Sequence, residues 1–413
     1  MTVFEQGKNA KGTLTFMSQV TTEQKNNALN AVADALEKNI DVIIAANKID
    51  LTEGKENGLN DGLLDRLMFN EERIKGIADG VRQVALLDDP CGKIISDYKK
   101  DNGLEIKKIT VPIGVIGIIF EARPNVTVDA AALCLKSSNS VLLRGGKEAI
   151  NSNTALSKIM RDAVESVGFP RDVIQLVHDV SRQSANDMMN MNEYLDCLIP
   201  RGGKGLIKAV VNNSTVPVIE TGSGNCHIFV DESADINMAA EIIFNAKTQR
   251  ISVCNACESL VIHSKIIDKA LPVIAKKLKE KNVEIRGDER ACTACSLVSP
   301  ATEEDFYTEY LDYIISVKTV DSLDEAIEHI NRCSTGHSEA IITNNDENAD
   351  KFLKCIDSSS VYVNASTRFT DGGEFGLGAE IGISTQKLHA RGPMGLEQLT
   401  STKYLIYGNG QVR

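Results

Sequence analysis

Residues 115–144 read VIGIIFEARPNVTVDAAALCLKSSNSVLLR, and this stretch decides the fold class. Apolar runs over 115–120 and 141–143 have the length and composition of buried strands. The segment 128–136 between them has the pattern of a helix. A strand, a helix and a second strand in this order predict a βαβ unit with both strands parallel in one sheet.

The alternation of short apolar strands and helices continues beyond this unit. Residues 260–364 repeat it, which predicts an α/β chain with two doubly wound parallel-sheet domains and ligands at the carboxyl ends of the strands. The first ninety residues instead have helical periodicity. The further predicted elements are helices over 22–45, 61–87 and 148–167, strands over 173–177, 195–199 and 216–219, and a hairpin of exposed strands over 93–112.

Composition limits the classes of protein that fit. The 413 residues are 42% hydrophobic and 25% charged, which predicts a globular chain of two or three domains. No apolar run approaches the roughly 18 residues of a membrane span, and a net charge of −12 argues against a nucleic-acid partner. Ten cysteines without a recognisable signal peptide predict reduced thiols and a cytoplasmic location.

Cys254 is the main candidate for chemistry. Residues 249–263 read QRISVCNACESLVIH, in which a polar, basic approach precedes the cysteine and an apolar, strand-like run follows it. At the start of a helix, unpaired backbone N–H groups and the nearby Arg250 would lower the pKa of the Cys254 thiol. This setting predicts a nucleophile for covalent acyl transfer, whereas the alternative for any single cysteine is a buried apolar side chain.

Two C-x-x-C pairs suggest a structural zinc site as a rival interpretation. Cys254 and Cys257 form the first pair, and Cys292 and Cys295 form the second. The stretch between the pairs is longer than the roughly 15–20 residues of a compact zinc ribbon, and it has the pattern of a strand, a helix and a strand. The histidines also lack metal-ligand spacing, so we assign no metal.

Polar, glycine-rich loops follow several of the predicted strands. Glycines let backbone N–H groups approach a phosphate, and Arg144, Lys147, Arg201 and Lys204 supply positive charge. Although none of the loops is a complete G-x-G-x-x-G, their occurrence at successive strand ends predicts a nucleotide or phosphate cleft. The loops are EARPN (121–125), RGGKE (144–148), PRGGKG (200–205) and ETGSGNCH (220–227).

Taken together, these segments resemble the gamma-glutamyl phosphate reductase family of the aldehyde dehydrogenase superfamily, nearly from end to end. The resemblance implies NADPH-dependent reduction of L-glutamate 5-phosphate to L-glutamate 5-semialdehyde and phosphate, the second step of proline biosynthesis. It leaves open a separate glutamate 5-kinase as a partner. Independently of the resemblance, the exposed strands of the hairpin 93–112 are suited to pairing with another subunit and predict a homo-oligomer. The segments that carry it are 114–149, IPRGGKGLI (199–207), ETGSGNCHIFVDESAD (220–235), NAKTQR (245–250) with Cys254 and Asn255, and 363–400.

The resemblance implies roles for individual residues. Cys254 matches the nucleophile, and Asn125 matches the amide that stabilises the oxyanion. Arg144 and Lys147 lie where positive charge favours NADP over NAD, and Glu309 falls where a glutamate holds the nicotinamide ribose. The full cofactor-binding set is Arg144, Gly145, Gly146, Lys147, Gly202, Gly203, Thr221, Gly222 and Glu309, and the candidates for the anionic ends of the substrate are Arg123, Arg250 and Arg368.

The resemblance also implies three segments. Residues 1–223 would form the N-terminal helices and the NADP-binding domain, including the hairpin 93–112. Residues 224–370 would form the catalytic domain with Cys254. Residues 371–413 would form a C-terminal return and oligomerisation segment.

Other functions stay open at this point. A hydrolytic NAD(P)-dependent aldehyde dehydrogenase would use Glu220 as a base that activates water, and a zinc-stapled binding protein would have no catalysis. Within the family pattern, Ile251 and Ser252 stand where a proline is usual, so the loop before Cys254 is less restricted. Cys257 is also additional, and we expect it to form a disulfide with Cys254 under oxidation.

Overall fold

The chain folds into two compact units. The structure is a computed structural model that describes residues 1–413, apart from the side chain of Asp61. Residues 371–413, expected as one C-terminal segment, are shared between the units. Among the described residues, no helix combines the length and the apolar character that a membrane crossing needs. The first unit comprises Met1–Thr221, Gly376–Gly382 and Pro393–Arg413, and the second comprises Gly222–Phe375 and Ile383–Gly392.

A four-stranded parallel sheet forms the centre of the first unit, in the order β5-β4-β3-β6. All residues of β3 are buried, and Ile118 pairs with Leu143 of β4 while α7 connects the two strands. The predicted βαβ unit is therefore confirmed. The predicted strand 216–219 is reduced to one isolated bridge at Val218. The strands are β3 (Val115–Phe120), β4 (Ser140–Arg144), β5 (Ile174–Leu176) and β6 (Cys197–Arg201).

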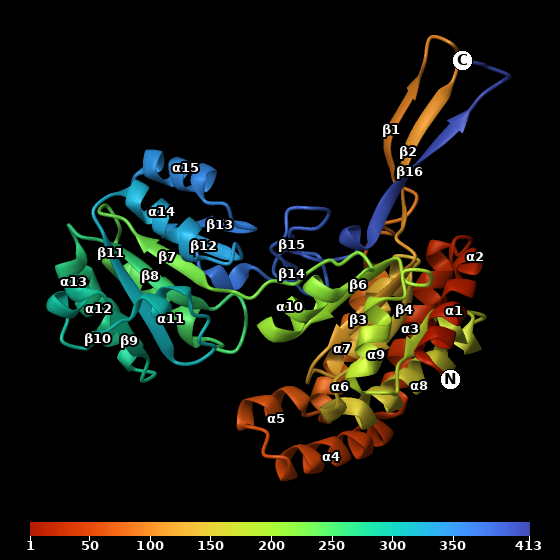
Figure 1. Ribbon diagram of the computed structural model, residues 1–413, viewed down its shortest axis with the longest axis horizontal. Coiled ribbons are helices and arrows are strands. Elements are labelled where there is room, and N and C mark those ends of the chain that lie inside the picture. The colour runs from red at the N-terminus through yellow and green to blue at the C-terminus, as the bar shows by residue number, and fades with distance from the viewer. The chain divides into compact units, whose positions relative to one another are not determined.

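Helices surround this sheet (Figure 1). Apolar residues of α1 and α9 pack against Val115, Ile119 and Leu142. Helices α7 and α8 contact the strands, and α3, α4 and α6 pack against them as an outer layer. The helices of this unit are α1 (Val3–Gly12), α2 (Leu14–Met17), α3 (Thr22–Lys38), α4 (Ile40–Glu56), α5 (Asp61–Leu67), α6 (Glu71–Leu86), α7 (Asn125–Lys136), α8 (Ile150–Ser166), α9 (Arg182–Met189) and α10 (Lys204–Asn213).

Two of the predicted N-terminal helices are each divided in the structure. Asn39 separates α3 from α4, and residues 68–70 separate α5 from α6. At the second break, the Asn70 side chain accepts a hydrogen bond from Arg73 N at 2.8 Å and caps the N-terminus of a new helix, α6. Apolar periodicity continues across both breaks, so it does not reveal them.

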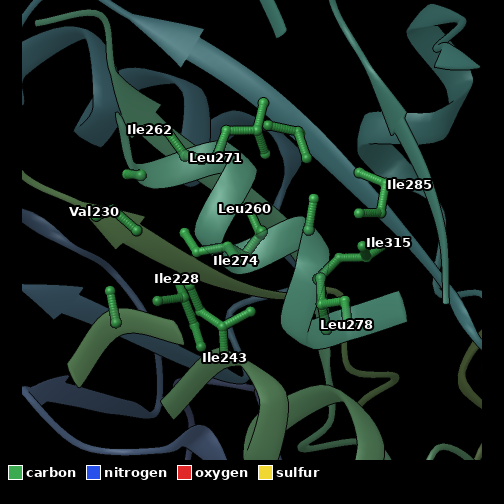
Figure 2. Close-up of a cluster of buried hydrophobic side chains, with 14 of the residues drawn as sticks. Ile228, Val230, Ile243, Leu260, Ile262, Leu271, Ile274, Leu278, Ile285 and Ile315 are labelled. Atoms are coloured by element: carbon green, nitrogen blue, oxygen red, sulfur yellow. The ribbon is translucent and has the colours of Figure 1, made fainter. Parts of the chain in front are cut away.

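A seven-stranded parallel sheet forms the centre of the second unit, in the order β10-β9-β11-β8-β7-β12-β13. Figure 2 shows Ile243 of α11 and Leu271 and Ile274 of α12 packed on one face of it. Helices α14 and α15 cover the other face through Phe229 and Phe352, among other residues. Helices on both faces of a parallel sheet confirm the predicted doubly wound class.

The elements of the second unit have the following bounds. The strands are β7 (Cys226–Val230), β8 (Cys257–His263), β9 (Glu284–Gly287), β10 (Val298–Pro300), β11 (Ile314–Val320), β12 (Ser338–Ile342) and β13 (Ser360–Val363). The helices are α11 (Ile236–Thr248), α12 (Ile267–Lys279), α13 (Glu289–Ala294), α14 (Leu323–Cys333) and α15 (Asp346–Cys355), and two short strands, β14 (Ile383–Ser384) and β15 (Gly392–Pro393), lie later in the chain.

A three-stranded antiparallel sheet completes the first unit. The predicted hairpin is confirmed as β1 (Ile94–Lys99) and β2 (Glu105–Pro112), and β16 (Thr400–Tyr407) pairs with the free edge of β2. The register places Tyr98, Ile106 and Ile406 side by side. Tyr98 is 46% exposed and Ile406 is 60% exposed, so an apolar row crosses the surface of this sheet.

Candidate active site

Cys254 lies in the loop 249–256, which joins α11 to β8. The strand-like run predicted after Cys254 is confirmed, because the chain enters the buried strand β8 at Cys257 and pairs there with β7 and β11. Cys254 does not stand at the start of a helix, the setting considered as a cause of a low pKa. The Cys254 side chain is half-buried. A helix N-terminus therefore contributes nothing to this thiol, and its environment comes from contacts of the loop itself.

The backbone of Cys254 is held closely on one side. Cys226 Sγ donates a hydrogen bond to the Cys254 carbonyl oxygen at 3.1 Å. A Cβ atom on Gly224 would lie only 1.4 Å from the same oxygen, so no other residue fits at position 224 without a backbone shift. Gly224 N donates in turn to Glu309 Oε1 at 2.7 Å. Glu309, predicted as a cofactor ligand, thus lies beside the Cys254 loop within the second unit.

Asn255 and Arg368 hold the other side of this loop. Asn255 Nδ2 donates to the Thr370 carbonyl at 2.9 Å, and Thr367 Oγ1 donates to the Asn255 carbonyl at 2.7 Å. The Arg368 guanidinium donates to Asn255 Oδ1 and, at 3.0 Å, to Gln249 Oε1. Arg368, predicted to bind the substrate, is therefore hydrogen-bonded to this loop.

The guanidinium of Arg368 also interacts electrostatically with the thiol. Burial lowers the pKa of Arg368, while the negative charges of Asp371 and of a Cys254 thiolate oppose that shift. Arg368 thus brings a half-buried positive charge to the loop that carries Cys254. Arg250, which was expected to supply this charge, is exposed, and its positive charge also lowers the pKa of Arg368.

The first unit carries Asn125 at the first position of α7. Asn125 Nδ2 donates to Asp129 Oδ2 at 2.9 Å, which uses one of the two N–H groups of the amide. Burial raises the pKa of Asp129 to about 6, although Asn125 and Arg201 lower it. Arg123, two residues before Asn125, is half-buried.

The glycine-rich loops of the first unit follow the carboxyl ends of β4 and β6, as predicted for parallel strands. A Cβ atom on Gly145 would lie 2.1 Å from Asn153 Nδ2, and one on Gly202 would lie 2.4 Å from Glu121 Oε2. At Gly146 the clash would be with the Glu148 carboxylate, at 2.2 Å. At these positions the backbone lies close to side chains of the protein itself, which leaves no room for a Cβ atom without a shift of those side chains.

Charged groups line the same loops. Gly203 N donates to Glu121 Oε2 at 2.8 Å, next to the N-terminus of α10. Arg144 Nη2 donates to the carbonyls of Val180 at 2.7 Å and Ser181 at 2.9 Å, and burial lowers the pKa of Arg144. Lys147, in contrast, is exposed. The Gly203 N–H and the Arg144 guanidinium thus donate to groups of the protein, and Lys147 is the exposed cation of the loop after β4.

The segment ETGSGNCH spans the boundary between the units, which lies between Thr221 and Gly222. Thr221 is buried and donates through Oγ1 to the Pro200 carbonyl at 2.8 Å. Gly222 N donates to the Ile383 carbonyl at 2.9 Å, and a Cβ at this glycine would lie 2.3 Å from Thr385 Cγ2. Glu220 is half-buried.

The cysteine pairs do not assemble a metal centre. Cys257 is fully buried in β8, and burial raises the pKa of its thiol well above the usual range. Cys292 lies on α13. Across the described residues, no group of three histidine, cysteine, aspartate or glutamate side chains is arranged to hold a metal ion. The structure therefore gives the zinc interpretation no support.

Sequence reasoning missed an ion pair next to this loop. Lys247 of α11 and Glu258 of β8 are fully buried, and their charged groups lie 2.5 Å apart. A signal was present, because each is a charged residue in an apolar segment, FNAKT and ACESLVIH. Buried charges of this kind need a partner, so two of them flanking a candidate nucleophile predict a pair.

The chain is similar to known proteins along its whole length. A family model described as the aldehyde dehydrogenase family matches residues 3–311 and 306–405. The gamma-glutamyl phosphate reductase of Clostridium novyi (strain NT) is 59% identical over 411 residues, covering 100% of this chain and 99% of the relative. That of Halothermothrix orenii is 54% identical over 411 residues, covering 100% and 98%.

A solved structure of a gamma-glutamyl phosphate reductase is also similar to this chain over its whole length. The crystal structure of gamma-glutamyl phosphate reductase from Thermotoga maritima matches with a TM-score of 0.97 and 48% identity, and the match covers 100% of both chains. This chain is therefore an oxidoreductase that belongs to the aldehyde dehydrogenase family and, within it, to the gamma-glutamyl phosphate reductases.

Proposed function

We propose that this enzyme reduces L-glutamate 5-phosphate to L-glutamate 5-semialdehyde and phosphate with NADPH, as the second step of proline biosynthesis. The observation that carries the proposal is a half-buried Cys254 in a closely held loop to which the Arg368 guanidinium is hydrogen-bonded. The names of the relatives, at up to 59% identity, supply the substrate.

In the proposed reaction, the Cys254 thiolate attacks the acyl carbon of the substrate. The bond between this carbon and the phosphate oxygen breaks, and phosphate leaves with the electron pair, so that a thioester remains on Cys254. Bound NADPH supplies the hydride that reduces the thioester carbon. The resulting oxyanion needs donors, for which we propose the Asn125 amide and the Cys254 backbone N–H. Its collapse breaks the carbon–sulfur bond, releases the aldehyde and restores the thiolate without consuming water.

The residues of the first unit fit a dinucleotide phosphate. Both loops that follow β4 and β6 are rich in glycine, and the nearby arginines and lysines match its negative charge. Because Arg144 already donates to two carbonyls, we assign the larger part of 2′-phosphate recognition to the exposed Lys147. The other proposed cofactor contacts are Gly145, Gly146, Gly202, Gly203, Thr221, Gly222 and Glu309.

The deciding experiment is the reverse reaction. NADP reduction driven by glutamate 5-semialdehyde is measured with and without inorganic phosphate, on wild type and on Cys254→Ala. We expect activity that requires both phosphate and Cys254. Cys355→Ala serves as the control for loss of a thiol, since Cys355 is exposed on α15. Activity that does not depend on phosphate would refute the proposal and favour the hydrolytic dehydrogenase.

Glu220 distinguishes the reductase from the hydrolytic alternative. We propose that Glu220 does not activate water, because hydrolysis of the thioester would waste an activated substrate. Under turnover with L-glutamate 5-phosphate, release of glutamate should be negligible and unchanged in Glu220→Gln. Substantial glutamate release that disappears in this variant would contradict the proposed role.

We also propose that the enzyme is a homo-oligomer assembled through the sheet β1-β2-β16. The support is the exposed apolar row of Tyr98, Ile106 and Ile406, on a sheet whose edges would otherwise remain open to solvent. A glutamate 5-kinase that hands over the labile acyl phosphate is a further proposed partner, which co-purification of the two proteins would test.

A further inference from the structure

The buried ion pair brackets the loop that carries Cys254. Lys247 belongs to the last turn of α11, and Glu258 is the second residue of β8. Their side chains are both fully buried, and Lys247 Nζ lies 2.5 Å from Glu258 Oε2. The loop 249–256 therefore leaves α11 and enters β8 next to the same pair of charges, which holds its two ends together.

The pair also reaches the segment that contains Glu309. The second oxygen of Glu258 accepts a hydrogen bond from Leu311 N at 3.2 Å. Leu311 has a φ of +53°, a conformation that residues other than glycine rarely adopt, so this contact supports a strained turn. Glu309 lies two residues earlier and accepts from Gly224 N, and Gly224 packs on the Cys254 carbonyl. The ion pair is thus connected to Cys254 in two ways: through the two ends of the loop 249–256, and through the contacts of Leu311, Glu309 and Gly224.

Stability alone does not explain this pair. Removing two charges from water is costly, and an apolar pair of similar volume is often equally stable. The helix α11 and the strand β8 are already joined by apolar side chains such as Ile243 and Leu260. We therefore propose that Lys247 and Glu258 are positioning residues, which fix the ends of the loop 249–256 and thereby the placement of the Cys254 thiol. The inference rests on the proposed function in taking Cys254 as the nucleophile.

The test compares stability with the reactivity of Cys254. Burial raises the pKa of Glu258 to about 7, so measurements at pH 8 examine the ionised pair. Lys247→Met alone should lower the thermal unfolding midpoint, because Glu258 is then a buried charge without its partner. The double variant Lys247→Met/Glu258→Leu should regain most of that midpoint. Its rate of Cys254 alkylation by iodoacetamide should nevertheless change by roughly threefold or more, and kcat should fall about tenfold with little change in KM.

The ion pair of the buried Lys25 and the half-buried Asp89 in the first unit offers a control. Lys25→Met/Asp89→Leu removes an ion pair that lies outside the Cys254 loop, and it should leave the alkylation rate unchanged. If the apolar double variant at 247 and 258 does not fold, Glu258→Asp keeps the charge and shortens the side chain by one methylene, with the same expected change in alkylation. A folded variant with wild-type alkylation and kcat would overturn the inference. Alkylation needs no substrate or cofactor, so this readout is separate from a failure of the proposed function.

Discussion

The backbone at Gly224 lies against the backbone of the Cys254 loop. The clash of a Cβ atom at this position is with backbone, which cannot rotate away as a flexible side chain can. We expect Gly224→Ala to reduce kcat by at least tenfold and to lower the rate of Cys254 alkylation. Steady-state kinetics and mass spectrometry of the alkylated peptide would measure both effects.

The control for Gly224→Ala is the same substitution at Gly76. Gly76 lies in α6, where an added Cβ atom would have nothing within 4 Å and alanine favours the helix. Gly76→Ala should therefore raise the free energy of unfolding by about 0.5–1 kcal/mol without a change in kcat. Equal activity in both variants would show that the close approach at Gly224 has no catalytic importance.

The raised pKa of Asp129 predicts that the free energy of unfolding depends on pH. Because burial raises the pKa of Asp129 from 3.8 to about 6, the folded state holds this proton more tightly than the unfolded state does. The stabilising contribution is fully present below about pH 4 and is lost as the pH rises through 6. The stability of wild type relative to Asp129→Asn should thus fall by up to about 3 kcal/mol between pH 4 and pH 7. Thermal unfolding of both proteins across this pH range would test the prediction. A difference in stability between them that does not change with pH would contradict it.

At the scale of elements, Asn70 decides where α6 begins. Its side chain caps the helix through Arg73 N, so Asn70→Ala should lower the free energy of unfolding by about 1 kcal/mol. Asn70→Asp keeps an oxygen acceptor and should remain close to wild type. Chemical denaturation of the three proteins provides the comparison, and an equal loss in both variants would show that the cap is unimportant.

The strand 115–120 and the loop 249–256 differ in how far their local sequence determines their conformation. The strand 115–120 could be predicted to the residue because five apolar side chains, interrupted only by Gly117, belong to a strand that is buried on both faces. The run after Cys254 was predicted as strand-like and is β8, whereas a helix start at Cys254, considered as a source of positive charge, is absent. The outcome depends on the pairing of β8 with β7 and β11, which local sequence does not contain.

The candidate site was predictable in its chemistry but not in its contacts. Cys254 and the glycine loops follow from residue types at strand ends. The partners of Arg368 and Arg144 could not be predicted, because they depend on side chains and carbonyls that are distant in sequence or on the path of a loop. Both arginines are expected to bind ligands, and both also donate hydrogen bonds within the protein.

On the scale of the whole molecule, the exposed row on the sheet β1-β2-β16 predicts the assembly state. Ile406→Glu would place a charge in the proposed subunit interface and should shift the enzyme toward monomers. Ile406→Val keeps an apolar side chain and should assemble as wild type does. Light scattering after size-exclusion chromatography would distinguish them, and an unchanged mass for Ile406→Glu would exclude this face from the interface.

The set of chain segments that makes up the first unit could not be predicted from apolar periodicity. Its C-terminal pieces, Gly376–Gly382 and Pro393–Arg413, join residues from the first half of the chain. Such a discontinuous unit depends on strand pairing between distant segments, and apolar periodicity reports only on neighbours in sequence.

The pairing of β2 with β16 has a consequence for synthesis on the ribosome. About 290 residues separate these strands, so at roughly 5–20 residues per second β16 emerges about 15–60 s after β2. During that interval one edge of β2 lacks its strand and is open to other nascent chains. Lys107 and Lys108 on β2 place positive charge along that edge, which discourages edge-to-edge pairing until the last strand of the molecule arrives.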